Sequence, residues 1–171
     1  MVHIYCGDGK GKTTAAMGLA LRAAGRGKRV LIAQFLKGAD TGERLALARL
    51  PEVELLAVPE RVTFSFRMTE QERREAAGRF LNLCACCRER LASGQAELVV
   101  LDEACAAVNT GLLPLEELLT LMDGAPEGAE LVLTGRDPAP ELLERADYIT
   151  EMRCIQHPFQ RGVAARPGIE Y

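Results

Sequence analysis

The sequence predicts an α/β fold with a mostly parallel central sheet and helices on both faces. Short apolar runs alternate along the chain with longer segments of helical periodicity, the pattern of successive strand–helix units. The runs at residues 30–33 and 98–101 are continuously apolar, as in strands that are covered on both faces of a parallel sheet. No repeat or linker divides the 171 residues, so we expect one domain over residues 1–171.

The expected strands are the apolar runs, at residues 2–6, 29–35, 53–58, 97–101, 130–134 and 148–152. The expected helices lie between them, at residues 12–24, 69–92, 114–122 and 139–145. Gly25 and Gly27 end the first helix, and Thr69 with Glu72 forms a capping box at the start of the second. Pro114 is a favourable first residue for the third helix, and segments 38–42 and 59–68 are interpreted as loops.

The composition excludes several classes of partner. The 21 Lys and Arg and 24 Asp and Glu give a net charge of −3, which predicts no overall attraction to nucleic acid or to an anionic membrane. No apolar run approaches the ~20 residues that span a bilayer. The first six residues also lack the basic leader and apolar stretch of a secretory signal. We therefore expect a cytoplasmic protein with reduced cysteines, and neither nucleic acid nor membrane among its partners.

A glycine-rich segment joins the first expected strand to the first expected helix. Its end matches a Walker A loop, although the first glycine of that pattern falls on Cys6, and it reads Gly7-Asp8-Gly9-Lys10-Gly11-Lys12-Thr13-Thr14. Its glycines allow backbone N–H groups to turn inward and form an anion nest at a helix N-terminus. We predict that these eight residues bind the triphosphate of ATP, with Lys12 and Lys10 on phosphate oxygens and Thr13 on Mg²⁺. The alternative is a tight turn with solvated lysines.

Acidic residues follow the apolar run 98–101, as in a Walker B segment. Asp102 and Glu103 can each hold Mg²⁺ directly or through water, so we expect Mg²⁺, or Mn²⁺ in its place, at Thr13, Glu103 and Asp102. Asp102 could instead cap the next helical turn. Glu103 could either activate water or serve as the second metal carboxylate.

Ligands of open α/β sheets bind at the carboxyl ends of the strands, which here carry Asp8, residues 34–37, Asp102, Glu103, Gly135 and Arg136. Arg136 could bridge ATP phosphates or form a surface ion pair. Apolar side chains gather on the loop-like segment that contains Phe64, Phe66 and Met68, and they could line an apolar ligand pocket or plug the core.

Three cysteines lie close together in the long helix expected at 69–92. Cys84 and Cys87 fall on one apolar stripe with Phe80 and Leu91, whereas Cys86 points about 100° away from Cys87. The spacing is not that of a Cys₄ zinc site, so we interpret Cys84 and Cys87 as core residues.

Together these features resemble the ATP-dependent corrinoid adenosyltransferases, the cob(I)yrinic acid a,c-diamide adenosyltransferase family. The resemblance covers nearly the whole chain. Besides the phosphate loop through Ala16, it rests on Gln34-Phe35-Leu36-Lys37-Gly38, Val99-Val100-Leu101-Asp102-Glu103, Gly111-Leu112-Leu113-Pro114-Leu115-Glu116-Glu117, Thr134-Gly135-Arg136, Ala146-Asp147, Thr150-Glu151-Met152, His157-Pro158-Phe159 and Gly168-Ile169-Glu170-Tyr171.

The resemblance implies a RecA-like P-loop fold, a homodimer, and transfer of the 5′-deoxyadenosyl group of ATP to the cobalt of a reduced Co(I) corrinoid. Triphosphate is released, in adenosylcobalamin synthesis or salvage, and an electron donor protein such as a flavodoxin is an expected partner. Lys12, Lys10 and Thr13 are then the expected catalytic residues, with Glu103 favoured over Asp102 as the direct metal ligand.

The resemblance also assigns Phe64, Phe66 and Met68 to the corrinoid, as an apolar wedge below the ring. The family often has Phe-Thr-Trp where this chain has Phe64-Ser65-Phe66, so the wedge here has less aromatic area.

Two other functions fit a phosphate loop. A RecA-like ATPase would use Glu103 to activate water, and would usually need a basic groove, against which the acidic composition argues. A nucleotide-dependent regulatory protein would bind ATP without chemistry. The products separate the three functions: triphosphate and a cobalt–carbon bond, ADP and phosphate, or unchanged ATP.

Overall fold

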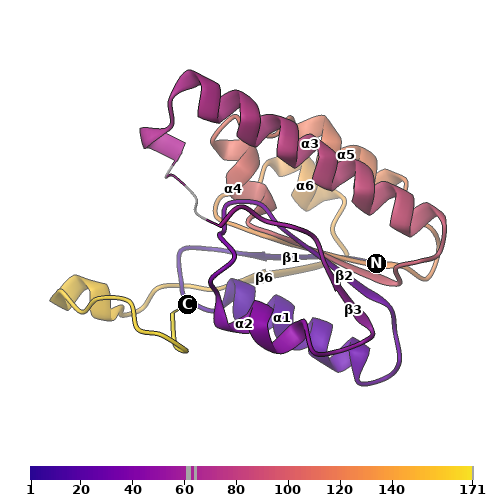
Figure 1. The fold of residues 1–171 in the computed structure, drawn as a ribbon, viewed down its shortest axis with the longest axis horizontal. Helices are drawn as coiled ribbons and strands as arrows, with labels where there is room; N and C mark the ends of the chain where they lie inside the picture. The colour runs from indigo at the N-terminus through magenta and orange to yellow at the C-terminus, as the bar shows by residue number, and fades with distance from the viewer. Residues whose placement is uncertain (61–62, 64, 171) are drawn as a thin grey trace.

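The computed structural model describes residues 1–60, 63 and 65–170. A six-stranded sheet lies between two layers of helices (Figure 1). The strands are β1 Val2–Cys6, β2 Val30–Gln34, β3 Val53–Leu55, β4 Leu98–Asp102, β5 Glu130–Thr134 and β6 Tyr148–Glu151. The helices are α1 Lys12–Ala24, α2 Gly42–Leu47, α3 Glu70–Ala92, α4 Ala104–Asn109, α5 Leu115–Asp123 and α6 Pro140–Glu144, with short 3₁₀ helices η1 Ser65–Arg67 and η2 Pro158–Arg161.

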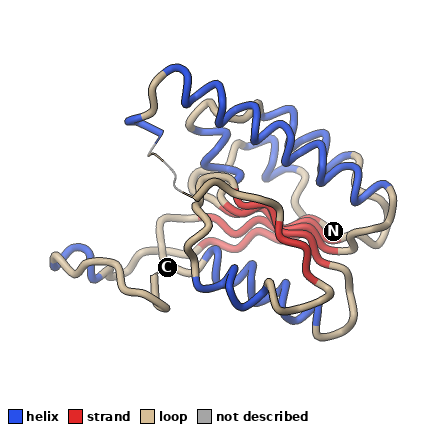
Figure 2. Tube along the Cα trace, viewed as in Figure 1, coloured by secondary structure: helices blue, strands red, loops and turns tan. Residues whose placement is uncertain are grey.

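The sheet has the order β3-β2-β4-β5-β1-β6, and every neighbouring pair of strands is parallel. The predicted α/β fold is therefore confirmed, with a sheet that is parallel throughout. All six carboxyl ends share one edge, where open α/β sheets bind their ligands. Figure 2 shows loops gathered at this edge, together with the tail that follows β6.

The two faces of the sheet carry separate cores. On one face, the alanines of α1 pack against Ile32, Val100 and Val132, and their small side chains bring the helix close to the strands. On the other, α3 to α6 cover Leu31, Val99 and Leu131. Because successive strand residues point to opposite faces, a continuously apolar strand supplies both cores at once.

The long helix α3 begins at the predicted capping box. The Thr69 hydroxyl accepts from the Glu72 backbone N–H, and the Glu72 carboxylate accepts from the Thr69 backbone N–H. Cys84 and Cys87 are fully buried on the α3 stripe, and burial raises the pKa of the Cys84 thiol to about 12. Both cysteines therefore pack as small apolar side chains, as the stripe predicted.

The structure departs from the predicted elements at three places. The strand predicted at 53–58 ends at Leu55, after which the Leu56 N–H makes one more bond to Ile32 and the chain leaves the sheet. Helices α2 and α4, six residues each, were not predicted. Among the described residues, no helix has both the length and the apolar character that crossing a membrane requires.

Candidate functional site

The glycine-rich loop leaves β1 at Gly7 and enters α1 at Lys12. Gly7 and Gly11 have φ of 97° and 118°, a backbone region that favours glycine. A Cβ on Gly7 would collide with the Met152 carbonyl oxygen, and one on Gly9 would lie 2.7 Å from the same oxygen. These contacts explain the departure from the standard pattern: Cys6 still belongs to the strand, and the turn starts one residue later.

Residues directly after β6 form hydrogen bonds to the phosphate loop. The Gly9 N–H donates to the Met152 carbonyl at 2.7 Å, and the Cys154 N–H donates to the Asp8 carboxylate at 2.9 Å. The bond from Cys154 lowers the pKa of Asp8. Asp8, predicted to contact ATP, therefore also fastens the loop to the last strand of the sheet.

Lys12 lies at the centre of the loop. Its side chain is buried, and its Nζ donates to the carbonyls of Gly7 at 2.7 Å and Gly9 at 2.8 Å. Burial is the largest cause that lowers the pKa of Lys12, and the charge of Glu103 opposes it. The ammonium thus stands at the anion nest that the loop glycines form.

Asp102, at the end of β4, is fully buried and bonded on both carboxylate oxygens. Oδ1 accepts from the hydroxyls of Thr13 at 2.9 Å and Thr134 at 2.7 Å. Oδ2 accepts from the Gln34 amide at 3.1 Å and the Lys37 ammonium at 2.8 Å. Four donors from three segments of the chain occupy the roughly four lone-pair positions of a carboxylate, so Asp102 connects these segments at the site. Asp102 does not cap α4, which begins after Glu103 without a side-chain cap.

Glu103 differs from Asp102 in the hydrogen bonds that its carboxylate makes. Its backbone is left-handed, with φ 61°, and its N–H donates to the Thr134 hydroxyl at 2.9 Å. Its carboxylate lines the cavity without a hydrogen bond or ion pair to another described residue. Burial, with the charge of Asp102 second, raises the pKa of Glu103, while Lys37 and Lys12 oppose the shift.

These residues fit a divalent cation. The Thr13 hydroxyl and the Glu103 carboxylate face one cavity and are hard oxygen donors of the kind that Mg²⁺ prefers. A positive group, the Lys37 ammonium, already lies 2.8 Å from both the Thr13 hydroxyl and the Asp102 carboxylate.

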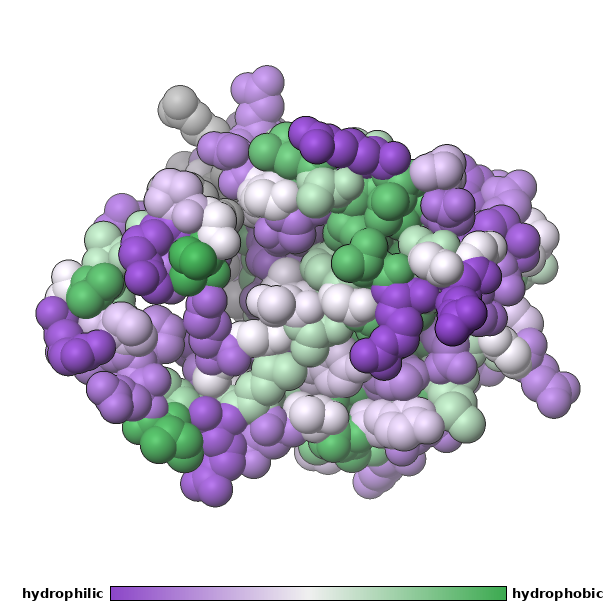
Figure 3. Space-filling view, turned by 90° about the horizontal axis from the view of Figure 1, so that it is seen from below, coloured by the Kyte–Doolittle hydropathy of each residue, from purple (hydrophilic) through white to green (hydrophobic). Residues whose placement is uncertain are grey.

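The cavity around the loop has a volume of about 740 Å³. Its lining joins the phosphate loop to polar strand-end residues and to the tail, namely residues 8–14, Met17, Lys37, Gly42, Glu43, Glu103, Arg136, His157 and 168–170. Arg136 thus lies where it was predicted. In the view from the α1 and α2 side, a hollow separates the tail from the body of the molecule (Figure 3).

The carboxyl-terminal tail is a part of the site that sequence reasoning missed. Lys10 Nζ donates to the Ile169 carbonyl at 2.7 Å and lies 4.0 Å from the Glu170 carboxylate. Hydrogen bonds from Arg166 lower the pKa of Glu170 to about 2, so the tail presents a negative charge to the loop. Segments 157–159 and 168–171 entered the family resemblance, but the tail has no periodicity from which its contact with the loop could be predicted.

The predicted corrinoid residues lie apart from this cavity. Phe64 is outside the described residues, whereas Phe66 lies in η1 with 77% of its surface exposed. Met68 packs partly buried against the core on the α3 face. Neither Phe66 nor Met68 lines the cavity, although η1 stands at the same end of the molecule as the phosphate loop (Figure 1).

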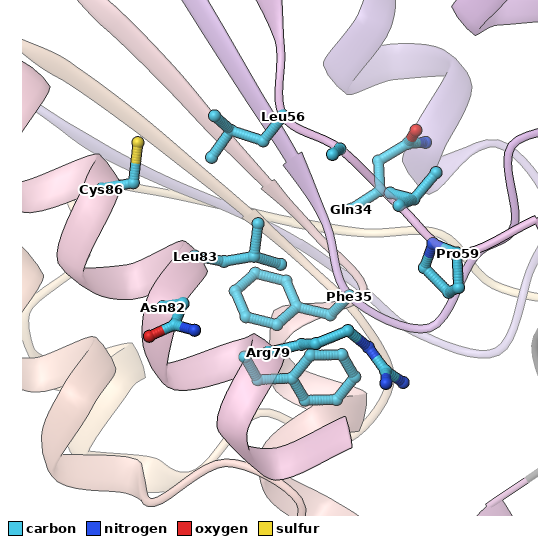
Figure 4. A pocket seen from close by; sticks show the side chains of 11 residues that line it. Gln34, Phe35, Leu56, Pro59, Arg79, Asn82, Leu83 and Cys86 are labelled. Carbon is cyan, nitrogen blue, oxygen red and sulfur yellow. The ribbon is translucent and has the colours of Figure 1, made fainter. Parts of the chain in front are cut away.

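A second, smaller pocket lies between α3 and the segment after β3. Figure 4 shows Leu56, Leu83 and Phe35 at its apolar floor, with Arg79 and Cys86 from α3 beside them. Its volume of about 290 Å³ is at the lower limit for drug-sized ligands. A corrinoid is larger, so this pocket does not replace η1 as the corrinoid candidate.

The family model and the sequence relatives named here identify one family. Residues 1–171 match the family model described as ATP:corrinoid adenosyltransferase BtuR/CobO/CobP. A corrinoid adenosyltransferase of Salmonella typhimurium is 36% identical over 182 residues, covering 100% of this chain and 85% of that protein. One from Escherichia coli K12 is 35% identical over 173 residues, with the same coverage. Domain III of the Thermotoga maritima replication initiation protein DnaA has a TM-score of 0.45 at 14% identity, covering 88% of this chain and 53% of that one.

Proposed function

The chain belongs to the ATP:corrinoid adenosyltransferase family and adenosylates corrinoids, and we propose that the cavity around the phosphate loop is where it binds the triphosphate of ATP. The observation that carries this proposal is the convergence of Lys12, Thr13 and Glu103 on one cavity. Family membership also decides between the alternatives left open by the sequence, in favour of the transferase over an ATPase or a regulatory protein.

The reaction needs little covalent chemistry from the protein. The electron pair of Co(I) attacks the 5′ carbon of ATP, the cobalt–carbon bond forms, and the carbon–oxygen bond to the α-phosphate breaks. The triphosphate leaves with those bonding electrons, so no protein base is required. The protein must orient the reactants and stabilise the leaving charge. We assign that stabilisation to the loop N–H groups, Lys12, Lys10 and Arg136, which line the cavity.

We assign the metal to Thr13 and Glu103. Mg²⁺, or Mn²⁺ in its place, supplies positive charge to the triphosphate when bound. The Glu103 carboxylate has lone pairs to offer, whereas those of Asp102 are engaged by four protein donors. Asp102 then acts on the metal through Thr13, whose hydroxyl it orients.

We assign the corrinoid to the strand edge beside η1. Phe66 is an exposed aromatic side chain in η1, a segment at the phosphate-loop end of the molecule, as a wedge below the corrinoid ring would require. Met68 anchors that segment to the core on the α3 face. We further propose a homodimer, an electron donor such as a flavodoxin, and a cytoplasmic location where ATP is available.

The test is incubation with ATP, Mg²⁺ and chemically prepared cob(I)alamin. We expect one triphosphate and one cobalt–carbon bond for each ATP consumed, followed by phosphorus NMR and by the visible spectrum of the corrinoid. ADP with phosphate, or unchanged ATP, would contradict the proposed site chemistry.

A further inference from the structure

Lys37 lies beside Thr13, one of the two proposed metal ligands. It follows β2, and its ammonium lies 2.8 Å from the Thr13 hydroxyl, 2.8 Å from the Asp102 carboxylate and 3.6 Å from that of Glu43. Its side chain is 21% exposed and that of Asp102 is 0% exposed, so the ammonium forms the outer boundary of a buried acidic cluster.

A buried carboxylate requires a compensating positive charge. Gln34 and Thr134 give Asp102 hydrogen bonds but no net charge, so Lys37 is its cationic partner among the described residues. A divalent cation bound by Thr13 and Glu103 would lie close to this ammonium, which is 2.8 Å from the Thr13 hydroxyl. Two cations among the same oxygens repel each other, so the metal and Lys37 compete for this place.

We propose that Lys37 is a tethered counter-cation that competes with Mg²⁺ for the Thr13 hydroxyl beside Asp102. ATP relieves the competition, because its triphosphate adds negative charge to a cavity that Lys37 also lines. The metal then binds well only together with the nucleotide. This inference rests on the metal site assigned above, and it makes Lys37 a positioning residue that couples metal binding to substrate binding.

The experiment measures Mn²⁺ binding to the full chain without ATP or corrinoid, by the electron paramagnetic resonance signal of free Mn²⁺. Lys37→Met should bind Mn²⁺ about 10-fold more tightly than the unaltered protein, within the range of ~5–150-fold typical of coupled sites. Lys37→Arg keeps the charge and should stay close to the unaltered protein. With ATP added, the advantage of Lys37→Met should shrink.

Lys10→Met is the matched control, since it removes the same charge from the same cavity but away from Thr13. It should change Mn²⁺ affinity less than Lys37→Met does. Equal gains in both lysine variants, or no gain in Lys37→Met, would overturn the proposal.

Thermal denaturation shows whether each variant folds and gives a second readout of Mn²⁺ binding. Because Lys37→Met leaves Asp102 without its cationic partner, the Tm of this variant should fall. Mn²⁺ should raise the Tm of Lys37→Met by more than it raises the Tm of the unaltered protein. Adding Thr13→Ala to Lys37→Met should weaken that rescue. If Lys37→Met cannot be purified, Lys37→Gln provides the same comparison, and an unchanged Mn²⁺ affinity in it would contradict the proposal. Because no corrinoid is present, failure of adenosyl transfer would show separately, in the transferase assay.

Discussion

The phosphate-loop region and the η1 segment lie at the same end of the molecule and are built in different ways. Around the loop, Asp102 alone accepts bonds from Thr13, Thr134, Gln34 and Lys37. In the η1 segment, Arg73 donates to the Ser65 carbonyl at 3.4 Å, and Met68 packs partly buried against the core. Under the proposed assignment of ATP and corrinoid, preorganised charge and exposed apolar surface occupy separate parts of one active site.

That division has a chemical reason. Leaving-group stabilisation depends on donors held in place before charge develops, so it requires a densely bonded framework. Contact with a large apolar ring depends on exposed area, which Phe66 provides. Changes in the first region should therefore reduce transfer itself, whereas changes in the second should affect how the corrinoid is prepared.

The largest expected effect is that of Lys12→Ala. Its ammonium stands at the centre of the loop, so its loss should lower adenosyl transfer from cob(I)alamin at least ~10²-fold, as for removal of one preorganised contact. The measurement is the steady-state rate at saturating ATP. Lys28→Ala, which removes a lysine paired with Glu97, is the control and should keep the normal rate. Normal turnover in Lys12→Ala would remove the loop from the mechanism.

The second prediction tests whether Thr13 and Glu103 serve one metal. Thr13→Ala and Glu103→Ala should each weaken the response of the rate to Mg²⁺. The double variant should fall short of the summed effects by about 0.5–3 kcal/mol, because both residues act on the same ion. Titrations of the rate against Mg²⁺ measure all three variants. Strict additivity, or normal titrations in both single variants, would place the metal elsewhere.

The third prediction concerns the η1 segment. Phe66→Ala should lower activity from cob(II)alamin and a reductant about 10-fold, equivalent to ~1.4 kcal/mol, because the wedge no longer excludes a lower axial ligand. Activity from prepared cob(I)alamin should fall much less, and the four-coordinate signature of bound cob(II)alamin with ATP should disappear from its paramagnetic spectrum.

Phe159→Ala is the control for the wedge, since Phe159 is a phenylalanine in the tail with the same 77% exposure. It should leave the ratio of the two activities unchanged. Equal losses in both assays for Phe66→Ala, with an unaltered spectrum, would show that Phe66 is structural.

The smallest effect is expected at the base of the same segment. Thr69→Ala removes the N-cap of α3 and should lower the free energy of unfolding by about 1 kcal/mol, measured by urea denaturation. Transfer from cob(I)alamin should be unaffected, because the phosphate-loop framework lies elsewhere. A large loss of that activity would mean that the two regions are not independent.

Much of this arrangement could be predicted from the sequence because its signals are local. The phosphate loop, the continuous strands and the capping box each depend on neighbouring residues, and each stands where it was predicted. The resemblance favoured Glu103 as the metal ligand, but the residues alone could not separate the roles of Asp102 and Glu103, because their difference lies in which distant side chains contact them. Thr134 ends β5 and Lys37 follows β2, and no spacing in the sequence relates them to Asp102.

The contact between the phosphate loop and the end of β6 has a consequence for synthesis. Asp8 and Cys154 are 146 residues apart, so the loop is made first and its brace emerges after every other strand. Domains fold from the amino terminus as they leave the ribosome. A nascent chain that stops before β6 contains the phosphate loop but lacks Met152 and Cys154, whose backbone groups bond to the loop. If this contact is needed for the proposed nucleotide binding, we expect that binding to arise only when the rest of the sheet has been synthesised.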